Sequence, residues 1–470
     1  MRLSALRSGI MPYILLLALS LTGCAKAPHE PAFEPVRQEM AERIEFDLHQ
    51  HSGLMADEQV ALKIEQMLAK PLTADSAAQI ALFNNRRVQE LYQEIGLSRA
   101  ELIHAGLFRN PVFDASLLFP LDGGKTEIHL GLTKRIFDIF LVPMRKRVAE
   151  SRFDEVRTEV SSQLMDLAYG TRIAFFQVQY QERRVELLRE KAEAAELAYD
   201  FAVRLRNAGN ITELELHEQR DHYEMVLLKL RRAETEKRVS RERLNRLMGL
   251  WGQQTLWEIE EDLPDISLEE LEKKFEPDEL ESITIEASLN LEAARQKIIT
   301  AGHQLGLLDV SPLIPEVELG VRGEKKSDWH IGPSVSFPLP LFHRGHIHHH
   351  GPINLRRQQE SYTALAIELR SIAREAVYEF QSARDTVIYY QKVILPLRER
   401  IVNETMLQYH AMTVGPIALL RSKEHQIDAL LEYAAASKDY WTARADLEKL
   451  SAGGVPGNSG GLRNDNRKMF

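Results

Sequence analysis

Histidine is concentrated in one short segment of the chain. Five of the sixteen histidines fall within eight residues, namely His343, His346, His348, His349 and His350. Neutral imidazoles at this density bind Cu(II), Zn(II) or Ni(II). The segment therefore predicts either weak Cu or Zn binding or a plain polar loop, and the sequence leaves both readings open.

The only cysteine, Cys24, ends the tetrad Leu21-Thr22-Gly23-Cys24. A positively charged start and a short apolar run, residues 10–21, precede it. That pattern is typical of a secretory signal and is too short to span a bilayer as a helix. The tetrad resembles a bacterial lipoprotein box, which implies a signal peptide over residues 1–23 and a covalent lipid, such as palmitate, on Cys24. The alternative is an ordinary signal peptide with an incidental cysteine.

Other chemistry finds little support. A single cysteine excludes disulfides within the chain and thiolate zinc sites. The net charge of −10, from 59 basic and 69 acidic residues, comes without the clustered basic surface of a nucleic-acid binder. The sequence shows no nucleophile–base arrangement, phosphate-binding glycine loop or zincin pattern, so we expect no enzymatic activity.

The chain beyond residue 72 is an internal duplication of two similar halves. Each half is expected to contain a helix, two strands, a very long helix, a glycine turn and a return helix. Gly209 and Gly415 mark the two turns, 206 residues apart, and Gly249 and Gly453 close the return helices, 204 residues apart. The predicted parts are a lipid-anchored N-terminal tether with some helix (24–72), a first repeat (73–250), a linker (251–276), a second repeat (277–453) and a flexible tail (454–470).

The long helices are the clearest prediction. No proline lies between Pro143 and Pro264, and a single glycine interrupts residues 144–207. A helix of that length measures about 96 Å. Its apolar residues recur at spacings of three, four and seven, which indicates packing against other long helices. The second long helix is expected at about 353–412, with a kink or a new start at Pro396.

Two β-hairpins are expected, at 112–136 and 315–341, because apolar and polar residues alternate there. Such strands fit a membrane barrel with a wet lumen, or half-buried hairpins on a soluble protein. Four strands cannot close a barrel, and open sheet edges are not tolerated in lipid. Two copies would give eight strands around a filled interior, whereas three would give twelve strands around a lumen.

The order and spacing of these elements resemble the TolC-like outer-membrane efflux channel family over about residues 73–453. The turn from Arg206 to Leu214, the proline-rich stretch Val335–Phe342 and Leu395-Pro396-Leu397 carry the local likeness. The resemblance implies an α+β membrane protein that forms a homotrimer. A twelve-stranded barrel would lie in the outer membrane of a Gram-negative bacterium, with a helical barrel of about 100 Å reaching into the periplasm.

The resemblance also implies partners. The two turns would form a periplasmic tip that docks onto a periplasmic adaptor, or membrane fusion protein, bound to an inner-membrane pump. The predicted docking residues are Arg206, Gly209, Asn210, Ile211, Val414, Gly415 and Pro416. Both glycines are expected in left-handed turns, either for docking or as plain helix caps. Acidic residues near the tip, Glu424 and Asp428 among them, would line it or lie on exposed helix faces.

Two functions follow from the sequence. One is a channel that conducts substrates from the periplasm to the exterior, with heavy-metal ions included if the histidine segment binds them. The other is a periplasmic adaptor or coiled-coil scaffold lipoprotein. Adaptors normally have one hairpin flanked by small β domains, which favours the channel. Residue 25 is Ala rather than Asp, so the outer membrane, not inner-membrane retention, is the expected location.

Overall fold

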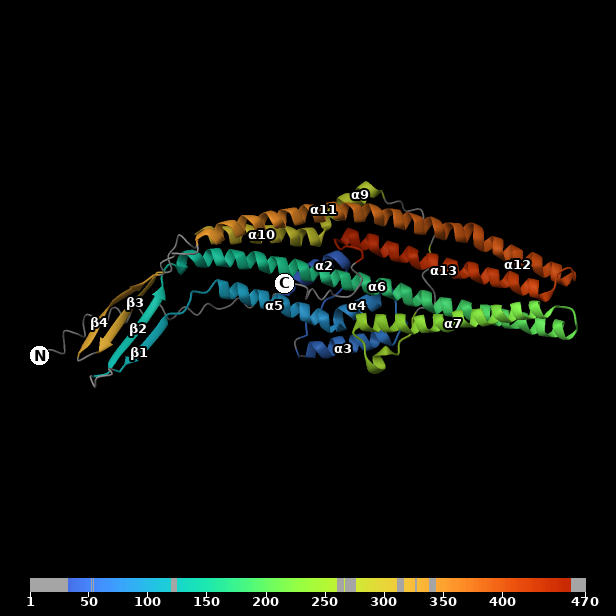
Figure 1. The fold of residues 1–470 in the computed structure, drawn as a ribbon, viewed down its shortest axis with the longest axis horizontal. Helices are drawn as coiled ribbons and strands as arrows, with labels where there is room; N and C mark the ends of the chain where they lie inside the picture. The colour runs from blue at the N-terminus through green and yellow to red at the C-terminus, as the bar shows by residue number, and fades with distance from the viewer. Residues whose placement is uncertain are drawn as a thin grey trace.

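The computed structural model describes residues 33–51, 53, 55–119, 125–259, 266, 276–310, 317–325, 328–337 and 344–457. The predicted signal peptide, Cys24, His343 and residues 458–470 lie outside this part of the chain. Figure 1 shows a small sheet at one end of a long bundle of helices, whose two turns reach the opposite end.

The elements follow one another in two similar series. The first, preceded by α2 (Glu34–Ile44) and α3 (Met55–Leu68), consists of α4 (Ala74–Asn84), α5 (Arg86–Ala105), β1 (Val112–Leu118), β2 (Glu127–Arg135), α6 (Asp138–Asn207) and α7 (Glu213–Met248). After a short 3-10 turn, η1 (Gly252–Thr255), the second consists of α9 (Pro277–Ala287), α10 (Leu289–Val310), β3 (Glu318–Lys325), β4 (Trp329–Ser336), α11 (Arg344–Tyr389), the π-helical turn η2 (Tyr390–Ile394), α12 (Leu395–His410) and α13 (Pro416–Ala452).

The two long helices differ in their continuity. Helix α6 runs for 70 residues, or about 105 Å, and begins before Pro143 rather than after it. The second long helix changes at η2, directly before Pro396. A proline lacks the N–H that an α-helix needs and crowds the carbonyl four residues back, so the helix widens there. The predicted kink or new start at Pro396 is confirmed.

The largest buried cluster lies where α2, α4, α5 and the middle of α6 meet. Val36 and Met40 of α2 are fully buried against it, together with Leu164 of α6. Burying such a side chain stabilises the fold by about 1.5–3 kcal/mol. Residues 34–44 therefore belong to the helical body, although the sequence predicts a tether over 24–72.

For the part of the chain that is described, no helix is long and apolar enough to cross a membrane.

The two return helices end in the same way. Gly249 after α7 and Gly453 after α13 both adopt positive φ angles, of 68° and 103°. Asn84, at the break between α4 and α5, donates its side-chain amide to the carbonyl of Gly249 at 2.9 Å. At the break between α9 and α10, the backbone N–H of Leu289 donates to the carbonyl of Gly453 at 3.0 Å. Both halves of the chain therefore contain the same kind of contact, in which the end of the return helix meets the break between two earlier helices.

Replacing Gly453 tests this joint. A Cβ there would overlap the carbonyl oxygen of Ala287 in addition to imposing a left-handed strain, whereas a Cβ at Gly209 would meet open space. We expect Gly453→Ala to lower the free energy of unfolding by more than about 2 kcal/mol and Gly209→Ala by about 1–2 kcal/mol. Thermal unfolding of the purified protein in detergent compares them, and equal losses would contradict this account.

The four strands form one antiparallel sheet in the order β1-β2-β3-β4. The two hairpins, one from each series, meet where β2 pairs with β3, with Gly131 opposite Arg322. Helices α6 and α11 follow β2 and β4 and leave the sheet at the same end (Figure 1). The sheet therefore fixes where both long helices begin.

Candidate functional site

The sheet has one apolar and one polar face. Register places Phe113 beside Leu132, Leu132 beside Val321, and Leu319 beside Val335. The apolar face is exposed, with Phe113 at 66% and Ile331 at 68% of their full accessibility. The opposite face carries Asp114, Ser116, Glu127, His129, Thr133, Glu318, Arg322, Glu324, His330, Ser334 and Ser336.

Within the described residues, β1 and β4 each pair with one neighbour only. Each therefore presents an outer row of backbone N–H and C=O groups to further pairing. Among the described residues, the extensive contacts of the strands are with other strands, and those of the helices are with helices. A sheet with open edges and an uncovered apolar face is suited to closure by other copies in lipid.

The polar face also holds a group of side chains that the sequence analysis did not single out as a site. Glu127, His129 and Glu324 bring a ligand-type atom each to within 4.8 Å of one another. Glu324 comes from the second series and the other two from the first. Their proximity depends on the pairing of β2 with β3, which no local pattern in the sequence reveals.

The first turn at the helical tip joins α6 to α7. Gly209 has φ 75°, and the N–H of Asn210 donates to the carbonyl of Leu205 at 2.9 Å, which closes a Schellman-type turn. Thr212 then caps α7, with its hydroxyl accepting from the N–H of Glu215 at 3.2 Å. The backbone N–H and hydroxyl of Thr212 in turn hydrogen-bond the Glu215 carboxylate and lower its pKa.

Arg206 also stabilises this turn. Its Nε lies 2.6 Å from a carboxylate oxygen of Glu213, and this hydrogen bond and the guanidinium charge lower the pKa of Glu213. Arg206, Gly209 and Asn210 are exposed, and Ile211 is half-buried. The first predicted set of docking residues thus lies together on an accessible turn.

The second turn, between α12 and α13, corrects one prediction. Gly415 has an extended conformation, with φ −83° and ψ 166°, and is not left-handed. The left-handed residue is Met412, with φ 58°. Gly415 instead precedes Pro416, which disfavours helical dihedrals in the residue before it and is itself suited to the first position of α13.

Hydrogen bonds show how the two turns correspond. The N–H of Thr413 donates to the carbonyl of Gln408 at 3.0 Å, as Asn210 does to Leu205 in the first turn. Met412 therefore corresponds to Gly209, and Gly415 to the cap Thr212. Matching the two glycines with each other was wrong by three residues. Val414 and Pro416 are half-buried and Gly415 is exposed.

Met412 provides a test of this correspondence. Its side chain is 92% exposed and its left-handed backbone costs about 1 kcal/mol. We expect Met412→Gly to slow hydrogen exchange at Thr413 by about fivefold, because it relieves that strain.

Ala411→Gly is the matched control, since Ala411 has φ −78° and glycine gains nothing there. Faster exchange in Met412→Gly, or equal effects of both changes, would contradict the assignment.

An ion pair and a hydrogen bond join the two hairpins of helices near the tip. Lys191 of α6 contacts Asp428 of α13 at 2.5 Å, and His222 of α7 contacts Glu424 of α13 at 2.5 Å. The side chains of Lys191 and Glu424 are only 8% and 7% exposed. Glu424 and Asp428 therefore hold the hairpins together, a role that neither reading of the sequence included.

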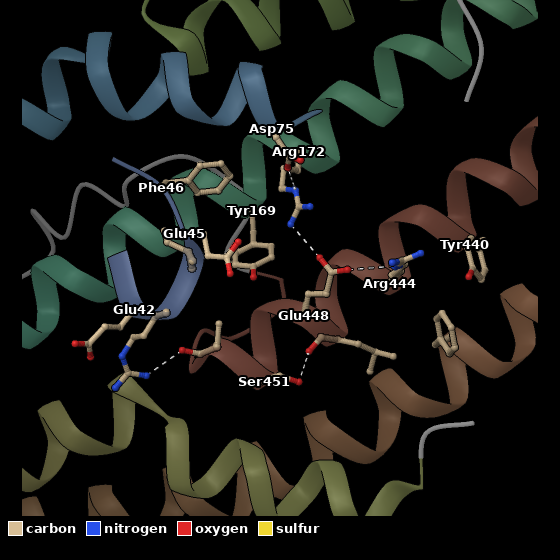
Figure 2. Close-up of a pocket in the computed structure, with 15 residues that line it drawn as sticks. Glu42, Glu45, Phe46, Asp75, Tyr169, Arg172, Tyr440, Arg444, Glu448 and Ser451 are labelled. Atoms are coloured by element: carbon tan, nitrogen blue, oxygen red, sulfur yellow. Dashed lines mark hydrogen bonds and ion pairs between the residues drawn. The ribbon is translucent and has the colours of Figure 1, made fainter. Parts of the chain in front are cut away.

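A cavity of about 710 Å³ lies further along the bundle, between α2, α4, α6, α11 and α13. Figure 2 shows Arg172 between Asp75 and Glu448, at 3.0 and 2.9 Å, with Glu448 also held by Arg444 at 3.1 Å. Burial raises the pKa of Tyr169 beside them to about 12. These charges pair with one another across three helices, so the cavity is a structural joint between them.

The histidine segment is helical rather than a loop. Helix α11 begins at Arg344, so His346, His348, His349 and His350 lie in its first two turns. His343 lies outside the described residues, and His350 is exposed. Helical spacing places the backbone positions of His346 and His350 about one turn apart.

Comparison with known protein families finds a match for part of the chain. Residues 114–250, from β1 through the return helix α7, match the family model described as outer membrane efflux protein. The match covers β1, β2, α6 and α7 of the first series, and the second series repeats the same order of strands and helices.

Solved structures share the fold over most of the chain. The outer membrane channel CmeC of Campylobacter jejuni is 15% identical with a TM-score of 0.68, covering 84% of this chain and 90% of that one. The outer membrane protein VceC of Vibrio cholerae is 14% identical with a TM-score of 0.63, covering 81% and 96%. The outer-membrane channel OprN is 15% identical with a TM-score of 0.66, covering 83% and 92%.

No curated protein sequence matches the chain. The family and the similar structures are efflux or channel proteins. They confirm the predicted fold class and the prediction that the chain is not an enzyme. They also favour the channel over the adaptor or scaffold alternative.

Proposed function

We propose that three copies of this chain form the outer membrane channel of a tripartite efflux system. The channel would conduct substrates from the periplasm to the exterior. A periplasmic adaptor and an inner-membrane pump would complete the system, with the pump supplying the energy. The match of residues 114–250 to the outer membrane efflux protein model supports the efflux role, and the open sheet supports the copy number.

The observation that carries this proposal is the exposed apolar face of a four-stranded sheet with two open edges. Lipid would cover that face, and strands of neighbouring copies would pair with β1 and β4. Eight strands enclose a space that side chains fill, whereas twelve leave a lumen. A conducting pore therefore calls for three copies, with the polar face lining it.

The tip supports docking and gating. Its turns are exposed at the end of the helices remote from the sheet, with Arg206 and Gly209 on one and Gly415 on the other (Figure 1). The contacts of Asp428 and Glu424 hold the two hairpins of one chain together. Docking of an adaptor at the turns would shift the hairpins and open the tip as an iris.

Conductance across a planar bilayer tests the channel. The purified trimer is expected to give discrete, long-lived current steps. The variant Glu424→Gln/Asp428→Asn should increase the open fraction, because it weakens both contacts between the hairpins. Glu186→Gln is the control, since Glu186 pairs within its own helix with Arg183. A monomer, or a trimer that conducts in neither form, would contradict the proposal.

Cys24 is proposed to carry the lipid that anchors the chain to the outer membrane. Mass spectrometry of the mature protein is expected to show a diacylated N-terminal Cys24, and Cys24→Ser should abolish both the lipid and processing at residue 24. Unchanged processing with no added lipid in either protein would show an ordinary signal peptide instead.

A further inference from the structure

We propose that Glu127, His129 and Glu324 form a binding site for a divalent transition-metal ion on the polar face of the sheet. The site is separate from the histidine segment of α11. It lies at the end of the strands away from α6 and α11, near the turns that join β1 to β2 and β3 to β4 (Figure 1).

Strand register brings the three side chains together. Glu127 and His129 are two residues apart on β2 and so point to the same face. His129 lies directly opposite Glu324 on β3. Paired residues of this kind have Cβ atoms about 4.5–5.5 Å apart. The site therefore forms only when the hairpins of the two repeats pair with each other.

The distances suit coordination better than hydrogen bonding. Nε2 of His129 lies 3.6 Å from Oε2 of Glu127, beyond the range of a hydrogen bond. Two ligand atoms each about 2.1 Å from a tetrahedral zinc ion lie about 3.4 Å apart. All three ligand atoms fall within 4.8 Å of one another, so small rotations about the side-chain bonds would complete the geometry.

His129 has a ring nitrogen that is available to a ligand. Its Nε2 is buried, and among the described residues it has no hydrogen-bond partner. A buried polar atom without a partner is unfavourable and is uncommon in folded proteins. A metal ion bound to that nitrogen would satisfy it.

The donor set selects the class of ion. The two carboxylates and the imidazole make a mixed set of oxygen and nitrogen donors. An imidazole nitrogen favours Zn²⁺, Cu²⁺ or Ni²⁺ over Mg²⁺ and Ca²⁺, which prefer oxygen ligands. The side chains of His129 and Glu127 are 22% and 32% exposed, so an ion could enter from solvent. His330 lies opposite Glu324 on β4 and on the same face of the sheet.

The competing explanation is charge balance by Arg322. Arg322 lies two residues before Glu324 on the same face of β3. If its guanidinium neutralises the carboxylates, the cluster is an ordinary surface group and binds no zinc. The two explanations therefore predict different amounts of zinc bound per chain.

Zinc binding to the full-length protein in detergent tests the proposal, by equilibrium dialysis with metal analysis. The background is a variant with the five histidines from His343 to His350 changed to Ala, which removes the other candidate site. This background is expected to retain one Zn²⁺ per chain. Zinc that only the unaltered protein binds would report on the histidine segment and so test the predicted weak metal binding there.

Within that background, His129→Ala and Glu324→Gln are each expected to weaken zinc binding by more than about tenfold. His104→Ala and Glu360→Gln are matched controls on exposed helix surfaces and should leave it unchanged. Glu324→Gln keeps the shape of the side chain, and size-exclusion chromatography checks that each variant assembles normally.

Either of two results would overturn the proposal. One is a background protein that binds no stoichiometric zinc, and the other is undiminished binding in both His129→Ala and Glu324→Gln. Binding that an excess of Mg²⁺ displaces would contradict the assignment to a transition metal. None of these readouts depends on conductance. The metal site and the channel are therefore tested independently of each other.

Discussion

Backbone hydrogen bonding at the two open edges of the sheet is the constraint on which the rest of the molecule depends. Strands β1 and β4 each leave a row of backbone groups without a partner strand in the described chain, beside an exposed apolar face. Lipid satisfies an apolar face but cannot satisfy backbone groups. In the proposed channel, other copies of the chain complete the sheet, and they would set the position of α6 and α11 because both helices follow strands of the sheet.

The two repeats share the backbone geometry of their helix ends more closely than they share the residues at those ends. The turns at Gly209 and Met412 use the same hydrogen bonds although one residue is glycine and the other is not. The joints at Gly249 and Gly453 receive different donors, a side-chain amide in one and a backbone N–H in the other. In each repeat the return helix ends against a break between two neighbouring helices. The hydrogen-bond donors at that joint differ between the two repeats.

The strands and long helices could be predicted from local patterns, since alternation and heptad spacing are properties of neighbouring residues. The role of Gly415 could not, because the turn is set by which residue adopts a positive φ, and that residue is Met412. The contacts of Glu424 and Asp428, and the meeting of His129 with Glu324, depend on which helix faces and strands meet across about 200 residues. Local spacing carries no information on such pairings.

Cross-linking between β1 and β4 of neighbouring copies tests the shared sheet most directly. Within one chain these strands are three spacings apart, about 14 Å, which is too far for a disulfide. A panel pairs a cysteine at Asp114 or Ser116 with one at Ser334 or Ser336, and single-cysteine chains control for Cys24. The account predicts an oxidised, denaturant-resistant trimer in at least one pair and in no control. Failure of every pair to link neighbouring copies in the assembled protein would contradict it.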